Sequence, residues 1–240
     1  MENMNEKIAT LKKTARMAGL LYLIMAITGA FGNMYVPTQL IVMGNLSSTA
    51  TNIINNEFLF RAGILCNMIC QTVFVFLVLA LYQLFQNVSK YLTKTMFALV
   101  IVSVPIAFFI LFNQLFALTL LKEHFMTGFE PSQQQALAMV FLKMFDNGNY
   151  VIGIFWGLWL IPFGQLVYKS GFIPKIFGIF LLIGGISYVI DAIIFVLFPE
   201  FHSVTTIIVG ISSSIAELAI LFWLLIKGVR FSTDAQLSND

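Results

Sequence analysis

The chain has 240 residues, of which 59% are hydrophobic and 10% are charged, with a mean hydropathy of +0.91 and a net charge of +2. A soluble domain carries about 25% charged residues to cover its surface, so this composition excludes a soluble globule and favours a protein embedded in lipid. The basic residues are few and scattered, which excludes a nucleic-acid-binding surface.

Six apolar segments are long enough to cross about 30 Å of hydrocarbon as helices. They lie near residues 17–36, 59–85, 95–121, 150–167, 173–198 and 205–226. Unbroken apolar runs of this length lack the alternation that a barrel strand shows. The sequence therefore predicts an all-α fold, a polytopic transmembrane bundle of six helices. We expect a single domain over residues 1–231, followed by a disordered polar tail at 232–240.

The first apolar segment follows a basic stretch that contains Lys12, Lys13 and Arg16. The segment is longer than the apolar core of a cleavable signal peptide, which spans about 7–15 residues, and no clear cleavage site follows it. We therefore expect an uncleaved first transmembrane helix.

Two connections are longer than tight turns. In the connection before the second segment, Ser47 or Ser48 can cap a short helix. In the connection before the fourth segment, Pro131 suits a first helical turn, and an amphipathic stretch follows at residues 136–145. We expect each connection to hold a short helix on the outer side of the membrane.

The distribution of lysine and arginine predicts the orientation, because these residues favour the cytoplasmic ends of membrane helices. With the N-terminus inside, ten of the 13 basic residues face the cytoplasm and three face outward. The outward three are Arg61, Lys122 and Lys143, and the bias holds in each loop separately. The sequence therefore predicts cytoplasmic N- and C-termini in a multi-pass protein of a bacterial inner or plasma membrane.

Three charged residues lie inside the predicted spans, where each costs at least about 2.5–3.5 kcal/mol. Asp191 is about 10 Å below the outer end of the fifth segment. Glu217 is about 18 Å down the sixth segment, near the midplane. Arg61 lies about 3 Å inside the second segment, and its long side chain can reach inward.

Neutral polar residues accompany these charges in the outer half of the predicted bundle. They are Asn67, Gln71, Asn113, Gln114 and Tyr188. We therefore predict a polar pocket there, with Arg61, Asp191 and Glu217 as its charged members. In one interpretation Arg61 neutralises an acid and the amides bond neighbouring helices, at about 0.6 kcal/mol per bond. In the other interpretation, the cluster holds a ligand, an ion or a proton. One acid is left without a partner after Arg61 pairs with the other, and this favours the second interpretation.

Small and helix-breaking residues give further local expectations. Gly153 and Gly157 form a motif that is typical of a close helix contact. Pro105 is expected to kink the third segment, and Pro162 can break the fourth. His202 falls in an outer loop, where we expect a solvated side chain.

Motifs for catalysis or cofactor binding are missing from the sequence. It has no H-E-x-x-H helix, no G-x-S-x-G elbow and no phosphate-binding or dinucleotide glycine pattern. Two acids without a histidine in the predicted spans make a poor zinc site. We therefore expect no catalytic residue, metal or cofactor.

Three functions stay open, and in each of them the protein is in contact with the lipid bilayer. The first is a small transporter, sensor or binding protein that uses the polar pocket for a small ligand or a proton. The second is a non-catalytic accessory or scaffold subunit with a membrane protein partner. The third is an intramembrane lipid-modifying enzyme, which the missing motifs do not favour.

Several short strings, in their order and spacing, resemble a bacterial membrane family. The strings are Ala18–Tyr22, Gly44-Asn45, Leu59–Arg61, Leu79–Tyr82, Ser170–Pro174, Glu217-Leu218 and Trp223–Leu225. The family is known only as domain of unknown function number four-three-eight-six, and the resemblance runs from about Arg16 to Gly228. It implies a multi-pass helical protein and no established activity. Gly44-Asn45 stands where the family leads us to expect Gly-Asp.

Overall fold

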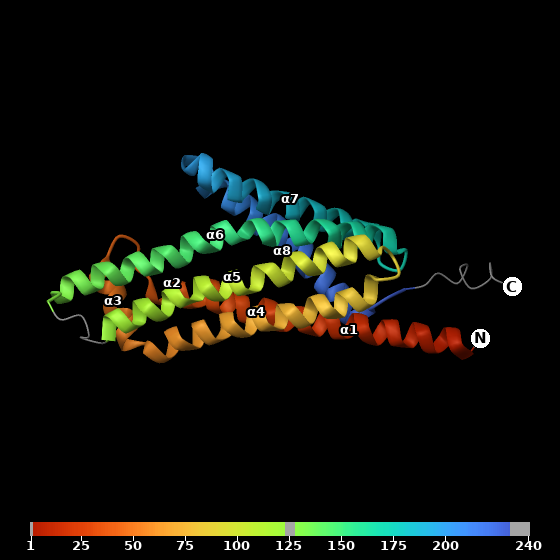
Figure 1. Ribbon diagram of the computed structural model, residues 1–240, viewed down its shortest axis with the longest axis horizontal. Coiled ribbons are helices and arrows are strands. Elements are labelled where there is room, and N and C mark those ends of the chain that lie inside the picture. Colours follow the sequence, from red (N-terminus) through yellow and green to blue (C-terminus); the bar gives the residue numbers. More distant parts are fainter. Residues whose placement is uncertain (1, 123–127, 231–240) are drawn as a thin grey trace. The chain divides into compact units, whose positions relative to one another are not determined.

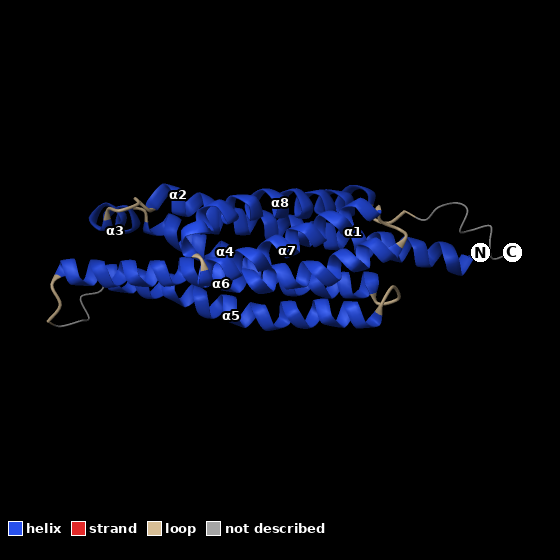
Figure 2. Ribbon diagram, turned by 90° about the horizontal axis from the view of Figure 1, so that it is seen from above, coloured by secondary structure: helices blue, strands red, loops and turns tan. Residues whose placement is uncertain are grey.

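A computed structural model describes residues 2–122 and 128–230. Within these ranges the chain forms helices and connecting turns, with no strand (Figure 2). The predicted all-α fold is therefore confirmed. The predicted disordered tail at 232–240 lies outside the described residues.

Six helices in the described residues are long and apolar enough to cross a membrane, which confirms the predicted number. They run over Glu6–Leu40, Glu57–Phe85, Lys90–Lys122, Pro131–Ser170, Lys175–Leu197 and Pro199–Lys227. Their length and apolar composition identify a multi-pass membrane protein.

Some of these spans join several regular elements (Figure 1). The first contains most of α1 (Glu2–Ala30), a π-helical segment η1 (Phe31–Tyr35) and α2 (Val36–Leu40). A short helix α3 (Leu46–Asn55) follows, and then come α4 (Glu57–Phe85), α5 (Lys90–Lys122), α6 (Pro131–Ser170) and α7 (Lys175–Leu197). The last span consists of η2 (Pro199–Phe201), α8 (His202–Phe222) and the π-helical η3 (Trp223–Lys227).

The fourth span differs from the prediction, because α6 is one continuous helix. It begins at Pro131, as expected, but it continues to Ser170, so the expected separate short helix in this connection is wrong. The polar residues at 146–149 do not interrupt the helix. Instead Gly148 packs closely on α5, where an added Cβ would lie 2.9 Å from the Ile110 side chain. This packing outweighs the weak helix propensity of the polar stretch. The helix also continues through Pro162, so the break proposed there is wrong.

The short helix α3 is confirmed, but its predicted N-cap is wrong. Asn45, and neither Ser47 nor Ser48, caps the helix. The Asn45 side-chain oxygen accepts a hydrogen bond of 2.9 Å from the Ser48 backbone N–H. Asparagine and serine cap helices about equally well, so residue type alone does not decide between them.

The chain forms two compact units. Unit 1 comprises Met1–Leu23, Phe74–Ser103 and Ile152–Asp240, and unit 2 comprises Ile24–Val73 and Val104–Val151. The single domain over residues 1–231 stays a prediction.

In unit 1, two pairs of glycines bring α6 and α7 into close contact. An added Cβ at Gly157 would lie 2.5 Å from the Gly185 carbonyl oxygen, and one at Gly185 would lie 2.8 Å from the Gly157 carbonyl oxygen. Gly164 and Gly178 approach each other in the same reciprocal way. The predicted close contact is therefore confirmed for Gly157. Gly153 has only ordinary van der Waals contact, with Tyr188 at 3.9 Å from an added Cβ.

In unit 2, a cluster of buried apolar side chains joins α2, α3, α4, α5 and α6. Its members are Val36, Leu40, Ile53, Phe60, Ile64, Ala117, Leu118, Leu120, Ala138 and Leu142. The short helix α3 thus contributes to the core of this unit through Ile53, which is fully buried.

Candidate functional site

The structure distributes the eight predicted pocket residues over the two units. Unit 1 contains Tyr188, Asp191 and Glu217. Unit 2 contains Arg61, Asn67, Gln71, Asn113 and Gln114. The single pocket that would combine all eight stays a prediction.

In unit 1, the carboxylate of Glu217 accepts a hydrogen bond from the hydroxyl of Tyr22. The Tyr22 Oη to Glu217 Oε2 distance is 2.7 Å, and Tyr22 is 1% exposed. Gly19, one turn earlier on α1, permits this contact, because an added Cβ there would lie 2.5 Å from the Leu225 backbone nitrogen. Among the described residues, no basic side chain forms an ion pair with Glu217.

A second polar contact joins α7 to α8 one turn from Glu217. The side chain of Tyr188, on α7, lies beside Ser213, which is four residues before Glu217 on α8, is 4% exposed and donates its hydroxyl to the Val209 carbonyl. Tyr188 also packs against the bare backbone of Gly157 and meets the Trp156 ring edge-on, at 6.3 Å between centroids. The glycine contact between α6 and α7 therefore helps to fix the position of the Tyr188 hydroxyl.

Asp191 forms the third polar group, six residues before the end of α7. Its carboxylate accepts a hydrogen bond from the Thr205 hydroxyl and lies 3.2 Å from His202 Nδ1 and 3.5 Å from Thr206 Oγ1. Asp191 is 7% exposed, so these contacts replace much of its hydration.

The structure corrects the expected place of His202. The residue begins α8, and its side chain is 14% exposed, so the predicted solvated loop side chain is wrong. The ring packs edge-on against Phe195 at 4.9 Å between centroids. Pro199 and Glu200 are residues typical of a loop, but here they form only the short η2 turn before the helix.

These three groups follow one another along a single face of α8. His202, Thr206, Ser213 and Glu217 recur at intervals of one or two helical turns, which places them on the same face. Figure 1 shows α7 and α8 side by side, and α7 contributes Tyr188 and Asp191 to the same row. From His202 to Glu217 the row spans about 22 Å at 1.5 Å per residue. We call it the unit 1 ladder, with the members Tyr22, Tyr188, Asp191, His202, Thr205, Thr206, Ser213 and Glu217.

The chemistry of the unit 1 ladder suits protons better than metals. Its carboxyl, imidazole and hydroxyl groups can each donate or accept a proton in a hydrogen bond. Among the described residues, no group of three or more His, Cys, Asp or Glu side chains is placed to hold a metal ion. Tyr22 and Ser213 were not predicted as site residues, because a hydroxyl group in a largely apolar segment carries little polar signal.

In unit 2, the acid partner of Arg61 is Glu57. Arg61 Nε lies 2.6 Å from Glu57 Oε1, and Lys122 Nζ lies 2.7 Å from Glu57 Oε2. Neither of the acids considered from the sequence, Asp191 or Glu217, has this role. The spacing of Glu57 and Arg61, four residues apart on one helix, is the signal that could have identified the pair.

The amides of unit 2 are buried but mostly unpartnered. Asn67, Gln71 and Gln114 are 3%, 8% and 6% exposed, and each has at least one buried amide atom with no hydrogen-bond partner among the described residues. Asn67 packs against the bare backbone of Gly32 in the π-helical segment. Asn113 differs, because its amide nitrogen donates to the Ile110 carbonyl at 2.9 Å.

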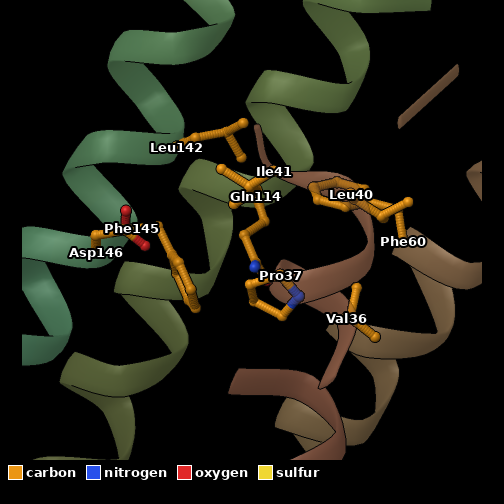
Figure 3. A pocket seen from close by; sticks show the side chains of 9 residues that line it. All are labelled: Val36, Pro37, Leu40, Ile41, Phe60, Gln114, Leu142, Phe145 and Asp146. Carbon is orange, nitrogen blue, oxygen red and sulfur yellow. The ribbon is translucent and has the colours of Figure 1, made fainter. Parts of the chain in front are cut away.

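A small cavity in unit 2 contains one of these amides and an acid that sequence reasoning missed. Figure 3 shows the side chains around it, and its water-accessible volume of about 10 Å³ suffices for one water. The lining residues are Val36, Pro37, Leu40, Ile41, Phe60, Gln114, Leu142, Phe145 and Asp146. Asp146 was missed because the continuous α6 places it in a span, where the sequence suggested a loop.

Comparisons with known proteins place the chain among uncharacterised relatives. A family model described as Domain of unknown function (DUF4386) matches residues 17–228. An uncharacterised protein of Archaeoglobus fulgidus is 30% identical over 153 residues, which cover 64% of this chain and 75% of that protein. No solved structure matches.

Proposed function

We propose that this chain, which belongs to the family Domain of unknown function (DUF4386), is a small proton-coupled transporter. The family description assigns no activity, so the proposal depends on the site. In it, Glu217 takes up and releases a proton, and the unit 1 ladder passes the proton along α8 between Glu217 and His202.

The observation that carries this proposal is the position of Glu217. The residue lies well inside an apolar span, and its hydrogen bond there comes from the buried Tyr22 hydroxyl. A charged side chain at membrane depth costs at least about 2.5–3.5 kcal/mol by insertion scales, and such residues commonly mark ion or proton pathways. A carboxyl group without a basic partner can avoid this cost by binding a proton.

The other members of the unit 1 ladder support a path for that proton. Ser213 with Tyr188, and then Asp191 with Thr205 and His202, supply proton donors and acceptors at successive turns. With the proposed cytoplasmic N- and C-termini, the His202 end of this row faces the outer side and Glu217 lies near the midplane. The same distribution of lysine and arginine leads us to place the protein in a cell membrane.

Proton flux in proteoliposomes tests the proposal. Purified protein is reconstituted with an internal pH-sensitive dye, and a potassium gradient with valinomycin drives protons inward. We expect wild-type vesicles to acidify faster than empty ones, and Glu217→Gln to lower the protein-dependent rate at least about tenfold, because a glutamine carries no transferable proton.

Two features of this experiment separate transport from a structural role. The glutamine oxygen can still accept the Tyr22 hydrogen bond, so Glu217→Gln preserves the contact between α1 and α8. The matched control is Glu200→Gln in η2, which removes an acid outside the unit 1 ladder and should leave the flux unchanged. A wild-type rate equal to that of empty vesicles would rule out the proposal, and so would an unchanged rate in Glu217→Gln.

A further inference from the structure

We propose that Arg61 and Lys122 bind the phosphate group of an anionic membrane lipid. This site lies in unit 2, and the inference is independent of the proton pathway proposed for unit 1.

The two cations converge on one acid, which leaves a net positive charge. Glu57 forms ion pairs with both: its Oε1 lies 2.6 Å from Arg61 Nε, and its Oε2 lies 2.7 Å from Lys122 Nζ. Arg61 uses only its Nε in this contact, so the two terminal nitrogens of the guanidinium keep their N–H donors for another partner. Arginine and lysine N–H groups form short, charge-assisted hydrogen bonds with phosphate oxygens.

A cup of about 180 Å³ lies beside these cations. Its lining is Arg61 from α4 and Leu115, Leu118, Thr119 and Lys122 from α5. The cup is several times larger than the roughly 30 Å³ that one water occupies in the liquid. Its lining combines two cationic side chains with two leucines. The Arg61 and Lys122 side chains are 55% and 43% exposed, so an anion can reach them.

The position of the cup matches that of a lipid headgroup. Glu57 is the first residue of α4 and Lys122 is the last residue of α5, so the cup lies where two membrane-spanning helices end. Basic pockets between the ends of transmembrane helices are suited to lipid phosphates.

Exposed apolar side chains continue from the cup along both helices. On α5, Leu115 and Phe112 follow Thr119 on the same helical face and are 37% and 52% exposed. On α4, Leu65 and Met68 follow Arg61 in the same way and are 55% and 40% exposed. A lipid with its phosphate in the cup would therefore have its acyl chains on an apolar surface.

A bound phosphate also accounts for basic residues on the outer side, where the predicted orientation leaves few of them. Arg61 and Lys122 are two of the three basic residues that the predicted orientation places on the outer side. The fold gathers both onto one carboxylate. A phosphate ligand gives these cations a role on the side of the membrane where basic residues are disfavoured.

Thermal unfolding of the full chain in a neutral detergent at low salt tests the inference. We expect phosphatidylglycerol to raise the unfolding midpoint in a saturable way, and phosphatidylcholine to raise it less because its choline repels the cations. Inorganic phosphate should give no comparable shift, because it lacks acyl chains. In the double variant Arg61→Gln/Lys122→Gln, the apparent affinity for phosphatidylglycerol should fall about 30-fold, at roughly 1 kcal/mol per basic residue.

The matched control is Lys143→Gln, which removes an exposed basic residue of α6 and should keep the full lipid response. Salt supplies a test on the wild-type protein should the double variant fail to fold: raising the ionic strength should weaken the response to phosphatidylglycerol. The inference is overturned by a salt-independent response, by an equal response in the double variant, or by equal responses to the two lipids. A shift with inorganic phosphate as large as that with phosphatidylglycerol would assign the cup to a free anion instead.

Discussion

The two units differ in how well their buried acids and amides are hydrogen-bonded. In unit 1, Glu217 and Asp191 are hydrogen-bonded to hydroxyl groups from other helices or other turns. In unit 2, Asn67 and Gln114 have buried amide atoms with no partner among the described residues. The charged cluster of unit 2 is instead found at helix ends, where Glu57 binds two basic side chains.

This difference indicates where hydrogen bonds contribute to stability and where they do not. An unpaired polar group in an apolar interior keeps its desolvation cost, whereas a paired one recovers much of it. The unit 1 contacts should therefore be costly to remove, and the unpartnered amides of unit 2 should be replaceable by apolar residues. The predictions that follow test this contrast through the free energy of unfolding, measured by titration with SDS in mixed micelles.

The largest effect is expected where packing positions the unit 1 ladder. Gly157→Ala adds a Cβ that would lie 2.5 Å from the Gly185 carbonyl oxygen and 2.8 Å from Tyr188 Cβ. The helices must move apart, and overpacking of this kind costs about 1–3 kcal/mol. Gly210→Ala is the matched control, because nothing lies within 4 Å of an added Cβ there. If both variants were equally stable, the close contact of α6 and α7 would be refuted.

A smaller loss is expected from Tyr22→Phe. The change removes the hydroxyl that donates to Glu217 while it keeps the buried ring. The acid then loses its hydrogen bond, which should lower the free energy of unfolding by about 1–2 kcal/mol. Tyr91→Phe is a suitable control, because Tyr91 is 77% exposed and should tolerate the change. If Tyr22→Phe were as stable as the wild type, the hydrogen bond to Glu217 would not stabilise unit 1, and the contrast between the units would fail.

The smallest effect, of opposite sign, is expected from Asn67→Leu. Leucine has nearly the shape of asparagine and carries no polar atom, so the unpartnered amide and its desolvation cost both disappear. The free energy of unfolding should stay the same or rise by up to about 1 kcal/mol. A loss of more than that amount would mean that the Asn67 amide has a partner in the membrane, and the contrast between the units would fail.

Much of the fold was predictable from the sequence, because a membrane-spanning helix needs a long apolar run and little else. All six spans were identified in this way, but not their ends. The joining of residues 136–145 to the fourth span depends on the contact of Gly148 with Ile110, which no local pattern reveals.

The candidate site was predictable only in part. The cost of burying charge identified Asp191 and Glu217 from their depth alone. Their partners could not be found in this way, since a hydroxyl such as that of Tyr22 acquires its role only through tertiary contact. His202 was expected in a loop and Asp146 lies outside the predicted segments, and only the helix boundaries of the structure place them inside spans.

In the proposed function, Glu217 exchanges a proton inside the membrane. Infrared difference spectroscopy of the reconstituted protein measures this directly, because the carbonyl stretch of a protonated carboxyl group is lost when the proton leaves. We predict that raising the pH bleaches a carboxyl band in the wild-type protein, and that this band is missing in Glu217→Gln but present in Glu200→Gln. An unchanged band pattern in Glu217→Gln would show that Glu217 does not titrate, and would contradict the account.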